Sequence, residues 1–204
     1  YNLKPNYMSE SEVSGSDIYL QSNVVFESGK KYLFKANSGH GKSSILNFIY
    51  GSNNNFNGKI DFNGINNDSI LEIRRTKLSY VFQDFKLFPE LTLLENILIK
   101  NNLTDFKTKD EILDLIDSVG LLDKKDKTVN TLSLGQRQRT AIVRSLCQPF
   151  KFLLLDEPFS HLDESNIAIL TSLINRELEI QNAGFLMTTL NNEYLFHYDK
   201  ILNL

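Results

Sequence analysis

Residues 36–43 read ANSGHGKS and combine two glycines, a lysine and two serines at spacings suited to holding phosphate. They fit the pattern G-x-x-x-x-G-K-[ST] except at Ala36, which replaces the first glycine. Backbone N–H groups of such a loop turn inward around phosphate oxygens, helped by the N-terminus of the following helix. Lys42 would reach the β- and γ-phosphates, and the Ser43 hydroxyl would ligate Mg²⁺. The alternative is a glycine-serine turn before an ordinary helix. The predicted nucleotide contacts here are Asn37, Ser38, Gly39, His40, Gly41, Lys42, Ser43 and Ser44.

Two adjacent carboxylates follow the apolar run FLLL at 152–155. Asp156 ends this run, where a carboxylate can hold the Mg²⁺ shell, often through water. Glu157 comes next and would point differently, so it could polarise an attacking water as a general base. The alternative is a solvated acidic loop, which the phosphate-type loop upstream makes less favoured.

Strands and helices must position these side chains, and the hydrophobic pattern predicts where they lie. Predicted strands cover 31–36, 58–64, 78–83, 151–158, 184–189 and 200–204. Predicted helices cover 42–50, two segments between about 92 and 119, one that Ser133 caps and Pro149 stops, and one over 163–180.

The order of these elements predicts the fold class. Strands alternating with helices indicate an α/β fold with a mainly parallel sheet. Consecutive helical segments between about 84 and 135 interrupt the alternation and predict an inserted helical lobe. The stretches 1–35 and 56–80 look more antiparallel and predict a small side sheet. We expect one domain over residues 1–204.

Composition narrows the class of protein. The 204 residues are 41% hydrophobic and 23% charged, which is ordinary for a soluble globular chain. A net charge of -3 weighs against a nucleic-acid partner, which usually requires a basic excess. No apolar run approaches the roughly 18 residues of a membrane span. The single cysteine, Cys147, falls in a helical pattern and is predicted to be a small core residue.

The segment LSLGQRQRTAIVRSL at 132–146 closely resembles the signature motif of ATP-binding cassette (ABC) proteins. Gln83 in YVFQDFKLFPELTLLENI resembles that family's glutamine loop, and SHLD at 160–163 resembles its D-loop. The motifs occur in the family's order, and the resemblance extends from about residue 13 to the end of the chain. It implies a P-loop NTPase (RecA-like) core with an antiparallel β lobe and an inserted helical lobe.

The resemblance also implies partners and roles. Two cassettes would sandwich two ATP molecules head to tail, as a homodimer or as paired cassettes. Ser133, Gly135 and Gln136 would then contact the γ-phosphate held by the other cassette. Gln83 would contact Mg²⁺ at the hinge to the helical lobe. The family's partner is an integral membrane permease subunit, so we expect a peripheral protein on the cytoplasmic face of the inner (plasma) membrane.

Within the family, RTKLSYVFQDFKLFPELTLLENI most resembles the group that serves lipoprotein release, macrolide export and cell-division-type complexes. Phe85, Leu87 and Phe88 would either fill a groove in a membrane partner or form the core of the helical lobe. For the three arginines of the signature segment we expect a solvated basic face. They are Arg137, Arg139 and Arg144.

Three positions depart from the family's pattern. Leu190 stands where the family usually has a histidine that contacts the γ-phosphate, and such a lost contact costs about a hundred- to a thousandfold in rate. Leu134 replaces the first glycine of the signature, and it would either crowd the phosphate or point away. The aromatic residue that stacks on adenine in the family is not evident in this sequence: its ungapped position falls near Val13, and Tyr7 is a candidate only if the spacing is stretched. Neither of the remaining histidines is expected to substitute for the missing one: His197 is predicted at the surface and His161 near the dimer seam.

These observations leave two main hypotheses. The first is the ATPase subunit of a membrane transporter, which the intact Lys42, Ser43, Gln83, Asp156 and Glu157 favour. The second is an ATP-gated regulatory clamp of a cell-envelope complex with little or no hydrolysis, which Leu190 and Leu134 favour. A soluble ABC protein of DNA repair or translation is disfavoured because the chain carries no tandem cassette, coiled-coil or zinc insertion, or basic extension. The signature segment argues against a P-loop kinase.

Overall fold

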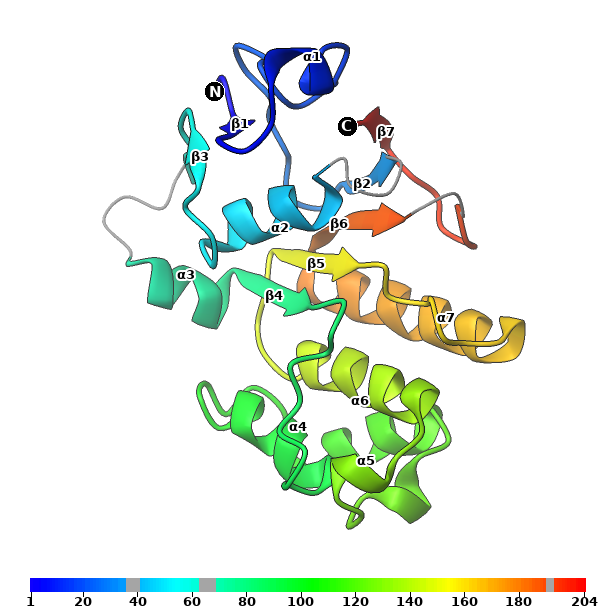
Figure 1. Ribbon diagram of the computed structural model, residues 1–204. Helices are drawn as coiled ribbons and strands as arrows, with labels where there is room; N and C mark the ends of the chain where they lie inside the picture. The colour runs from blue at the N-terminus through cyan, green and yellow to red at the C-terminus, as the bar shows by residue number, and fades with distance from the viewer. Residues whose placement is uncertain (36–40, 63–68, 190–192) are drawn as a thin grey trace.

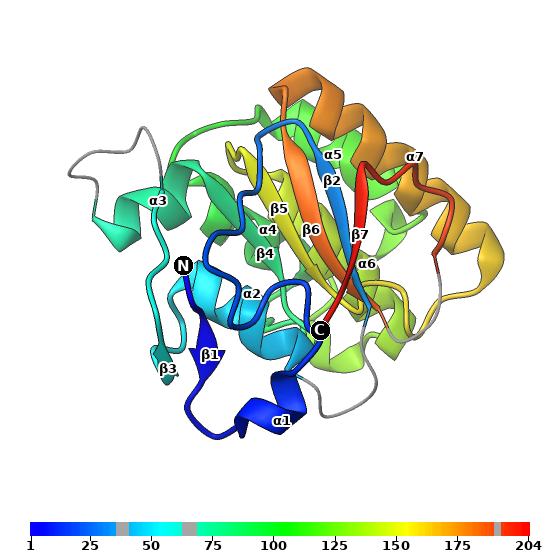
Figure 2. The same ribbon diagram turned by 90° about the horizontal axis from the view of Figure 1, so that it is seen from above.

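The computed structural model describes residues 1–35, 41–62, 69–189 and 193–204, and a five-stranded parallel sheet forms its centre (Figure 1 and Figure 2). The strand order is β4-β5-β6-β2-β7, and every neighbouring pair is parallel. The strands are β2 (Lys31–Lys35), β4 (Leu78–Val81), β5 (Phe152–Asp156), β6 (Gly184–Thr189) and β7 (Lys200–Asn203). The predicted mainly parallel sheet is therefore confirmed.

Helices cover both faces of this sheet, which explains why its inner strands are apolar without alternation. Leu153 and Leu155 of β5 join the core on the side of α6 (Leu134–Leu146) and α7 (Glu164–Gln181). Leu154, between them, joins the core on the side of α2 (Lys42–Tyr50). Cys147 is fully buried, and burial raises the pKa of its thiol to about 12, so it is a core residue as predicted.

Between β4 and α6 the chain forms a helical lobe that lies on the far side of α6 from the sheet (Figure 1). It contains α4 (Leu93–Asn101), α5 (Lys109–Ser118) and two 3₁₀ turns, η1 (Leu122–Lys124) and η2 (Val129–Thr131). Helices α4, α5 and α6 each begin with a capping box, in which a Ser or Thr hydroxyl and a Glu or Gln side chain exchange hydrogen bonds with the first turn. These caps mark where each helix of the lobe and α6 begins.

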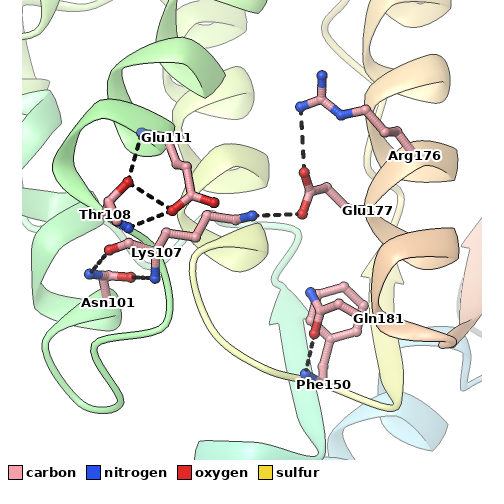
Figure 3. Close-up of polar contacts among 8 residues, drawn as sticks. All are labelled: Asn101, Lys107, Thr108, Glu111, Phe150, Arg176, Glu177 and Gln181. Carbon is pink, nitrogen blue, oxygen red and sulfur yellow. Dashed lines mark hydrogen bonds and ion pairs between the residues drawn. The ribbon is translucent and has the colours of Figure 1, made fainter.

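A buried ion pair joins this lobe to the core. The Lys107 ammonium, in the α4–α5 loop, lies 2.9 Å from the Glu177 carboxylate on α7, and both side chains are almost fully buried. Figure 3 shows the Asn101 amide holding the Lys107 backbone, with hydrogen bonds of 2.8 and 2.9 Å. Arg176 adds a weaker contact of 3.4 Å to the same carboxylate. The buried charges therefore compensate each other across two parts of the fold.

The predicted side sheet is present but smaller than expected. It consists of β1 (Lys4–Pro5) and β3 (Phe56–Asn57), which pair antiparallel, next to the short helix α1 (Glu10–Val13). The strand predicted over 58–64 is wrong for 58–62, which form no strand, and the predicted Asn63-Gly64 turn lies outside the described residues. Gly58 takes a φ of 101°, and a Cβ there would lie 2.5 Å from the carbonyl oxygen of Asn2, so the chain leaves the strand direction at this glycine.

One further short helix, α3 (Ile70–Thr76), leads into β4. No helix in the described part of the chain has both the length and the apolar character needed to cross a bilayer.

Candidate functional site

The N-terminus of α2 forms the base of the site. Gly41 is the N-cap with a left-handed φ of 80°, and Lys42 begins the helix. The Tyr19 hydroxyl donates a hydrogen bond of 2.9 Å to the Gly41 carbonyl, and a Cβ on Gly41 would lie 2.9 Å from that hydroxyl. Glycine is therefore needed here both for its backbone angle and for space. Of the predicted phosphate contacts, Asn37, Ser38, Gly39 and His40 lie outside the described residues, as does Ala36.

Asp156, at the end of β5, faces the first turn of α2. The Ser43 hydroxyl hydrogen-bonds to its carboxylate, and the Thr188 hydroxyl donates a bond of 2.7 Å from β6. Burial raises the pKa of Asp156, while these two hydrogen bonds act in the opposite direction. Two of the residues predicted to bind Mg²⁺, Ser43 and Asp156, thus lie in contact.

This pair of oxygen donors fits a divalent cation. A buried carboxylate gains most from a nearby positive charge, and hydroxyl and carboxylate oxygens are ligands that Mg²⁺ accepts. The described residues contain no group of three acidic, histidine or cysteine side chains able to hold a metal alone. A cation beside Ser43 and Asp156 would therefore need further oxygens from Gln83, water or phosphate.

Glu157 turns away from Asp156 and toward the lysine of the phosphate loop. Its Oε1 lies 3.5 Å from Nζ of Lys42, and both side chains are largely shielded from solvent. Glu157 has a left-handed φ of 47°, which is uncommon for a residue with a side chain. Its N–H donates 3.2 Å to the carbonyl of Thr188 on the neighbouring strand β6, which fixes the turn that follows β5. The backbone thereby aims two successive carboxylates in different directions, as predicted.

These groups open onto one cavity of about 230 Å³. Its lining residues are Tyr7, Gly41, Lys42, Ser43, Ser44, Gln83 and Glu157. The fold thus brings together the phosphate loop, the glutamine after β4 and the second acid after β5. A larger, mostly apolar cavity of about 470 Å³ includes Ile45, Ile49 and Phe62 in its lining and holds none of the predicted site residues.

Tyr7 is the aromatic residue beside this cavity. Its side chain is 54% exposed, and its hydroxyl hydrogen-bonds to the Ser44 hydroxyl at the start of α2. Val13, the position expected without stretched spacing, is buried in the core below α2 and cannot present a stacking surface. The structure therefore favours Tyr7 over Val13.

The signature residues lie at the N-terminus of α6 and do not line this cavity. The Ser133 hydroxyl accepts a hydrogen bond from the Gln136 N–H, and the Ser133 N–H donates one to Oε1 of Gln136, so the helix starts with a capping box. Leu134 is 47% exposed and points away from the core. Gly135 packs against the D-loop, since a Cβ there would lie 3.1 Å from the His161 carbonyl oxygen.

Gln138, which the sequence did not point to, connects α6 to the segment that follows β5, residues 157–161. Its amide nitrogen lies 3.4 Å from both the Glu157 carbonyl and the Ser160 hydroxyl, and its amide oxygen accepts 3.1 Å from the His161 N–H. It is almost completely buried. The signal in the sequence was a polar residue four positions before Ile142, on the apolar face of the helix.

The expectation of a solvated basic face on α6 is wrong. All three arginines donate to backbone carbonyl groups: Arg137 to Leu132 and Asn130, Arg139 to Val119, and Arg144 to Phe85 and Lys86. Each guanidinium thus supplies hydrogen bonds to backbone carbonyl groups outside the α-helices and strands.

The residues after Gln83 were expected either to contact a membrane partner or to form the core of the helical lobe, and they divide between these two environments. Phe85 is buried and Leu87 packs against the core, whereas Phe88 is 52% exposed. His197 is at the surface as predicted. Exposed His161 contacts the Ser160 hydroxyl through Nδ1 at 2.9 Å. Leu190 lies outside the described residues.

The family profile described as ABC transporter matches residues 20–160. The Trimethylamine N-oxide transport system ATP-binding protein TmoW of Pelagibacter ubique is 37% identical over 152 residues, which cover 70% of this chain and 45% of that protein. The probable ABC transporter ATP-binding protein PEB1C of Campylobacter jejuni is 36% identical over 151 residues, which cover 71% of this chain and 62% of that protein. The chain thus spans about half to three fifths of the length of these relatives.

Solved structures agree with the fold. The dimeric ATP-binding cassette MJ0796 in a post-hydrolysis state bound to ADP and Pi superposes with a TM-score of 0.71 at 27% identity, over 84% of this chain and 79% of that one. A putative ABC transporter ATP-binding protein from Pyrococcus furiosus gives a TM-score of 0.74 at 23% identity, over 89% and 87% of the two chains, which supports the fold alone.

Proposed function

Because the chain belongs to the ABC transporter family, we propose that it binds and hydrolyses Mg-ATP and thereby drives a separate membrane-embedded partner. The observation that carries this proposal is the single cavity onto which Lys42, Ser43, Gln83 and Glu157 open, beside buried Asp156. Residues from three separate parts of the sequence converge there with the chemistry that phosphoryl transfer needs.

We assign the roles as follows. Lys42 and the N-terminus of α2 bind the β- and γ-phosphates, with Asn37, Ser38, Gly39, His40, Gly41 and Ser44 completing the loop. Ser43, Asp156 and Gln83 would hold Mg²⁺, which would neutralise charge on the phosphates. Tyr7, exposed beside the cavity, would stack on the base. The γ-phosphate would compete with Glu157 for the Lys42 ammonium, and the released carboxylate would accept the proton of the attacking water.

We further propose a head-to-tail dimer, either a homodimer or paired cassettes. The N-terminus of α6 carries a hydroxyl cap and free N–H groups that suit an anion, and its residues do not reach the cavity of their own chain. Ser133, Gly135 and Gln136 would therefore contact the γ-phosphate held by the other cassette. Residues 1–204 would form one nucleotide-binding domain, with a helical lobe at about 84–135.

The partner we propose is an integral membrane permease subunit, with this chain peripheral on the cytoplasmic face of the membrane. Exposed Phe88, at the lobe side of the Gln83 segment, is available for such a contact. No nucleic-acid partner is expected at a net charge of -3. The resemblance to the lipoprotein-release, macrolide-export and cell-division-type group stays a prediction.

The test is steady-state ATP hydrolysis by the wild type and by Glu157→Gln, with nucleotide affinity measured in the same preparations. Loss of a general base should lower turnover at least a hundredfold while Mg-ATP binding persists. Glu179→Gln is the matched control, because it removes the same charge from an exposed position of α7. Equal turnover in the wild type and in Glu157→Gln would contradict the assignment.

A Leu190→His variant separates the regulatory-clamp alternative from the ATPase. If the wild type binds ATP but is as inactive as Glu157→Gln, and Leu190→His restores turnover, the clamp function is the correct one. If the wild type hydrolyses ATP, Leu190 is compensated by the surrounding site.

A further inference from the structure

The chain after Gln83 contains two consecutive residues in a strained backbone conformation. Phe85 has a φ of 63° and Lys86 a φ of 47°, and neither is a glycine. A left-handed residue with a Cβ costs about 1–2 kcal/mol, so two in succession persist only where the surroundings hold them.

Hydrogen bonds of the backbone connect Gln83 to these two residues. The Phe85 N–H donates 2.9 Å to the Phe82 carbonyl, closing a four-residue turn with Gln83 at its second position. The Lys86 N–H then donates 2.7 Å to the Asp84 carbonyl. The Gln83 side chain lines the cavity from this turn, so its position depends on the backbone conformation of Phe85 and Lys86.

Arg144, in the last turn of α6, forms hydrogen bonds with the backbone of both strained residues. Its two terminal nitrogens donate to the carbonyl oxygens of Phe85 and Lys86, at 2.6 and 2.7 Å. Its guanidinium forms no ion pair with a carboxylate in the described part of the chain, and burial lowers its pKa to about 10. A largely buried cation whose donors are directed at two adjacent carbonyls is a costly arrangement that a structural role must justify.

The other contacts of the strained pair are weaker or non-directional. The Lys86 ammonium pairs with Asp84 at 2.7 Å, but both side chains are 62% exposed, and such pairs contribute little. The Phe85 ring is buried and meets the His161 ring edge-on at 6.1 Å between ring centres, which anchors the side chain without fixing the carbonyl direction.

We propose that Arg144 is a positioning residue that holds the Gln83 turn against the C-terminal end of α6. The inference rests on the proposed hydrolysis for its functional consequence, but not for the contact itself. Helix α6 carries Ser133 at its N-cap and Arg144 eleven residues later, about 16 Å along the axis. A contact made by the signature end would thus be transmitted to Gln83 through one rigid helix.

The test compares Arg144→Lys with Arg139→Lys. Both replacements keep the charge but lose the planar donor geometry of arginine. Arg139 lies on α6 like Arg144, but it donates to the Val119 carbonyl at the C-cap of α5, away from Gln83. In nucleotide-free protein, amide hydrogen exchange at Phe85 and Lys86 should accelerate at least tenfold in Arg144→Lys and stay unchanged in Arg139→Lys. Unchanged exchange in both variants would overturn the proposal.

A Lys86→Gly background supplies a second readout. Glycine adopts the left-handed conformation without strain, so it should recover much of the turnover that Arg144→Lys loses. We expect Arg144→Lys to lower kcat about tenfold and raise the Mg²⁺ concentration for half-maximal activity, with ATP affinity within twofold of the wild type. A uniform loss of Tm, affinity and kcat without rescue by Lys86→Gly would show a merely structural role. If the wild type hydrolyses no ATP, the proposed function fails, while amide exchange still decides whether Arg144 holds the turn.

Discussion

Glu157 is restrained at three points, and this restraint explains how two adjacent acids serve different purposes. Its carboxylate pairs with the Lys42 ammonium, and its N–H donates to the Thr188 carbonyl. Its own carbonyl accepts a hydrogen bond from the Gln138 side-chain amide. The left-handed φ of 47° that results is the price of turning Glu157 toward the phosphate loop while Asp156 stays with Ser43. A flexible turn would let both carboxylates point to solvent.

Lys100, on α4, offers a residue-scale prediction about stability. It forms no ion pair with a carboxylate among the described residues, and burial, with smaller contributions from Arg144 and Arg74, lowers its pKa to about 8. Its ordinary value is higher, so below pH 8 the folded state carries a disfavoured charge that the unfolded state carries at no cost. We expect Lys100→Met to raise the free energy of unfolding at pH 7 by about 1–2 kcal/mol.

The stability gained by Lys100→Met should depend on pH. Between pH 8 and about 10.5 the folded wild type loses the proton from Lys100 before the unfolded chain does, so wild-type stability rises there. The difference between Lys100→Met and the wild type, from urea unfolding at pH 7 and pH 10, should therefore shrink. A difference that stays constant with pH would contradict the assignment to Lys100.

At the same scale, side-chain types predicted which residues the fold brings together at the cavity better than they predicted the residues that support them. Lys42, Ser43, Asp156 and Glu157 could be named because their types and spacing carry phosphate and metal chemistry. Arg144 was misjudged because its partners are backbone carbonyls, which every residue has and which leave no mark in a sequence.

At the scale of elements, boundaries were predictable wherever a cap or a glycine marks them. Helix α2 matches the predicted 42–50 because Gly41 and Gly51, both left-handed, enclose it. The strand over 58–64 failed because alternation of apolar residues does not reveal that Gly58 turns the chain beside Asn2. Alternation shows which residues could pair, but not whether a neighbouring strand is present to pair with.

Helix α6 carries the element-scale prediction, because its cap is proposed to serve both folding and function. Ser133→Ala should cost about 1 kcal/mol of stability through loss of the capping box. Thr108→Ala, at the capping box of α5, should cost a similar amount and is the matched control. Only Ser133→Ala should also weaken ATP-dependent dimerisation, measured by light scattering of the Glu157→Gln protein. Equal dimerisation in the two variants would argue against a role of Ser133 across the interface.

At the scale of the whole molecule, the Lys107–Glu177 pair decides how firmly the helical lobe is attached to the core. Both charges are buried, so Glu177→Gln leaves the Lys107 ammonium uncompensated and should cost about 3–5 kcal/mol. The double replacement Lys107→Met with Glu177→Leu removes both charges and should be nearly neutral. Urea unfolding of the two single variants and the double variant measures the coupling, and additive costs would refute it.

The lobe itself was predictable as an insertion because consecutive helical patterns interrupt the strand-helix alternation. Its attachment was not, because Lys107 and Glu177 are separated by 70 residues and each alone resembles an ordinary surface charge. Only the fold brings the α4–α5 loop against α7 (Figure 3).

The same ion pair constrains how the sequence of this chain can drift over generations. A lineage that exchanges Lys107 and Glu177 for apolar residues must pass through an intermediate with one buried, unpaired charge. Proteins usually exceed their stability threshold by only a few kcal/mol, so selection removes most carriers of that intermediate. Descendants should therefore keep both residues or lose both, and the junction between lobe and core should show paired substitutions where the surrounding surface varies freely.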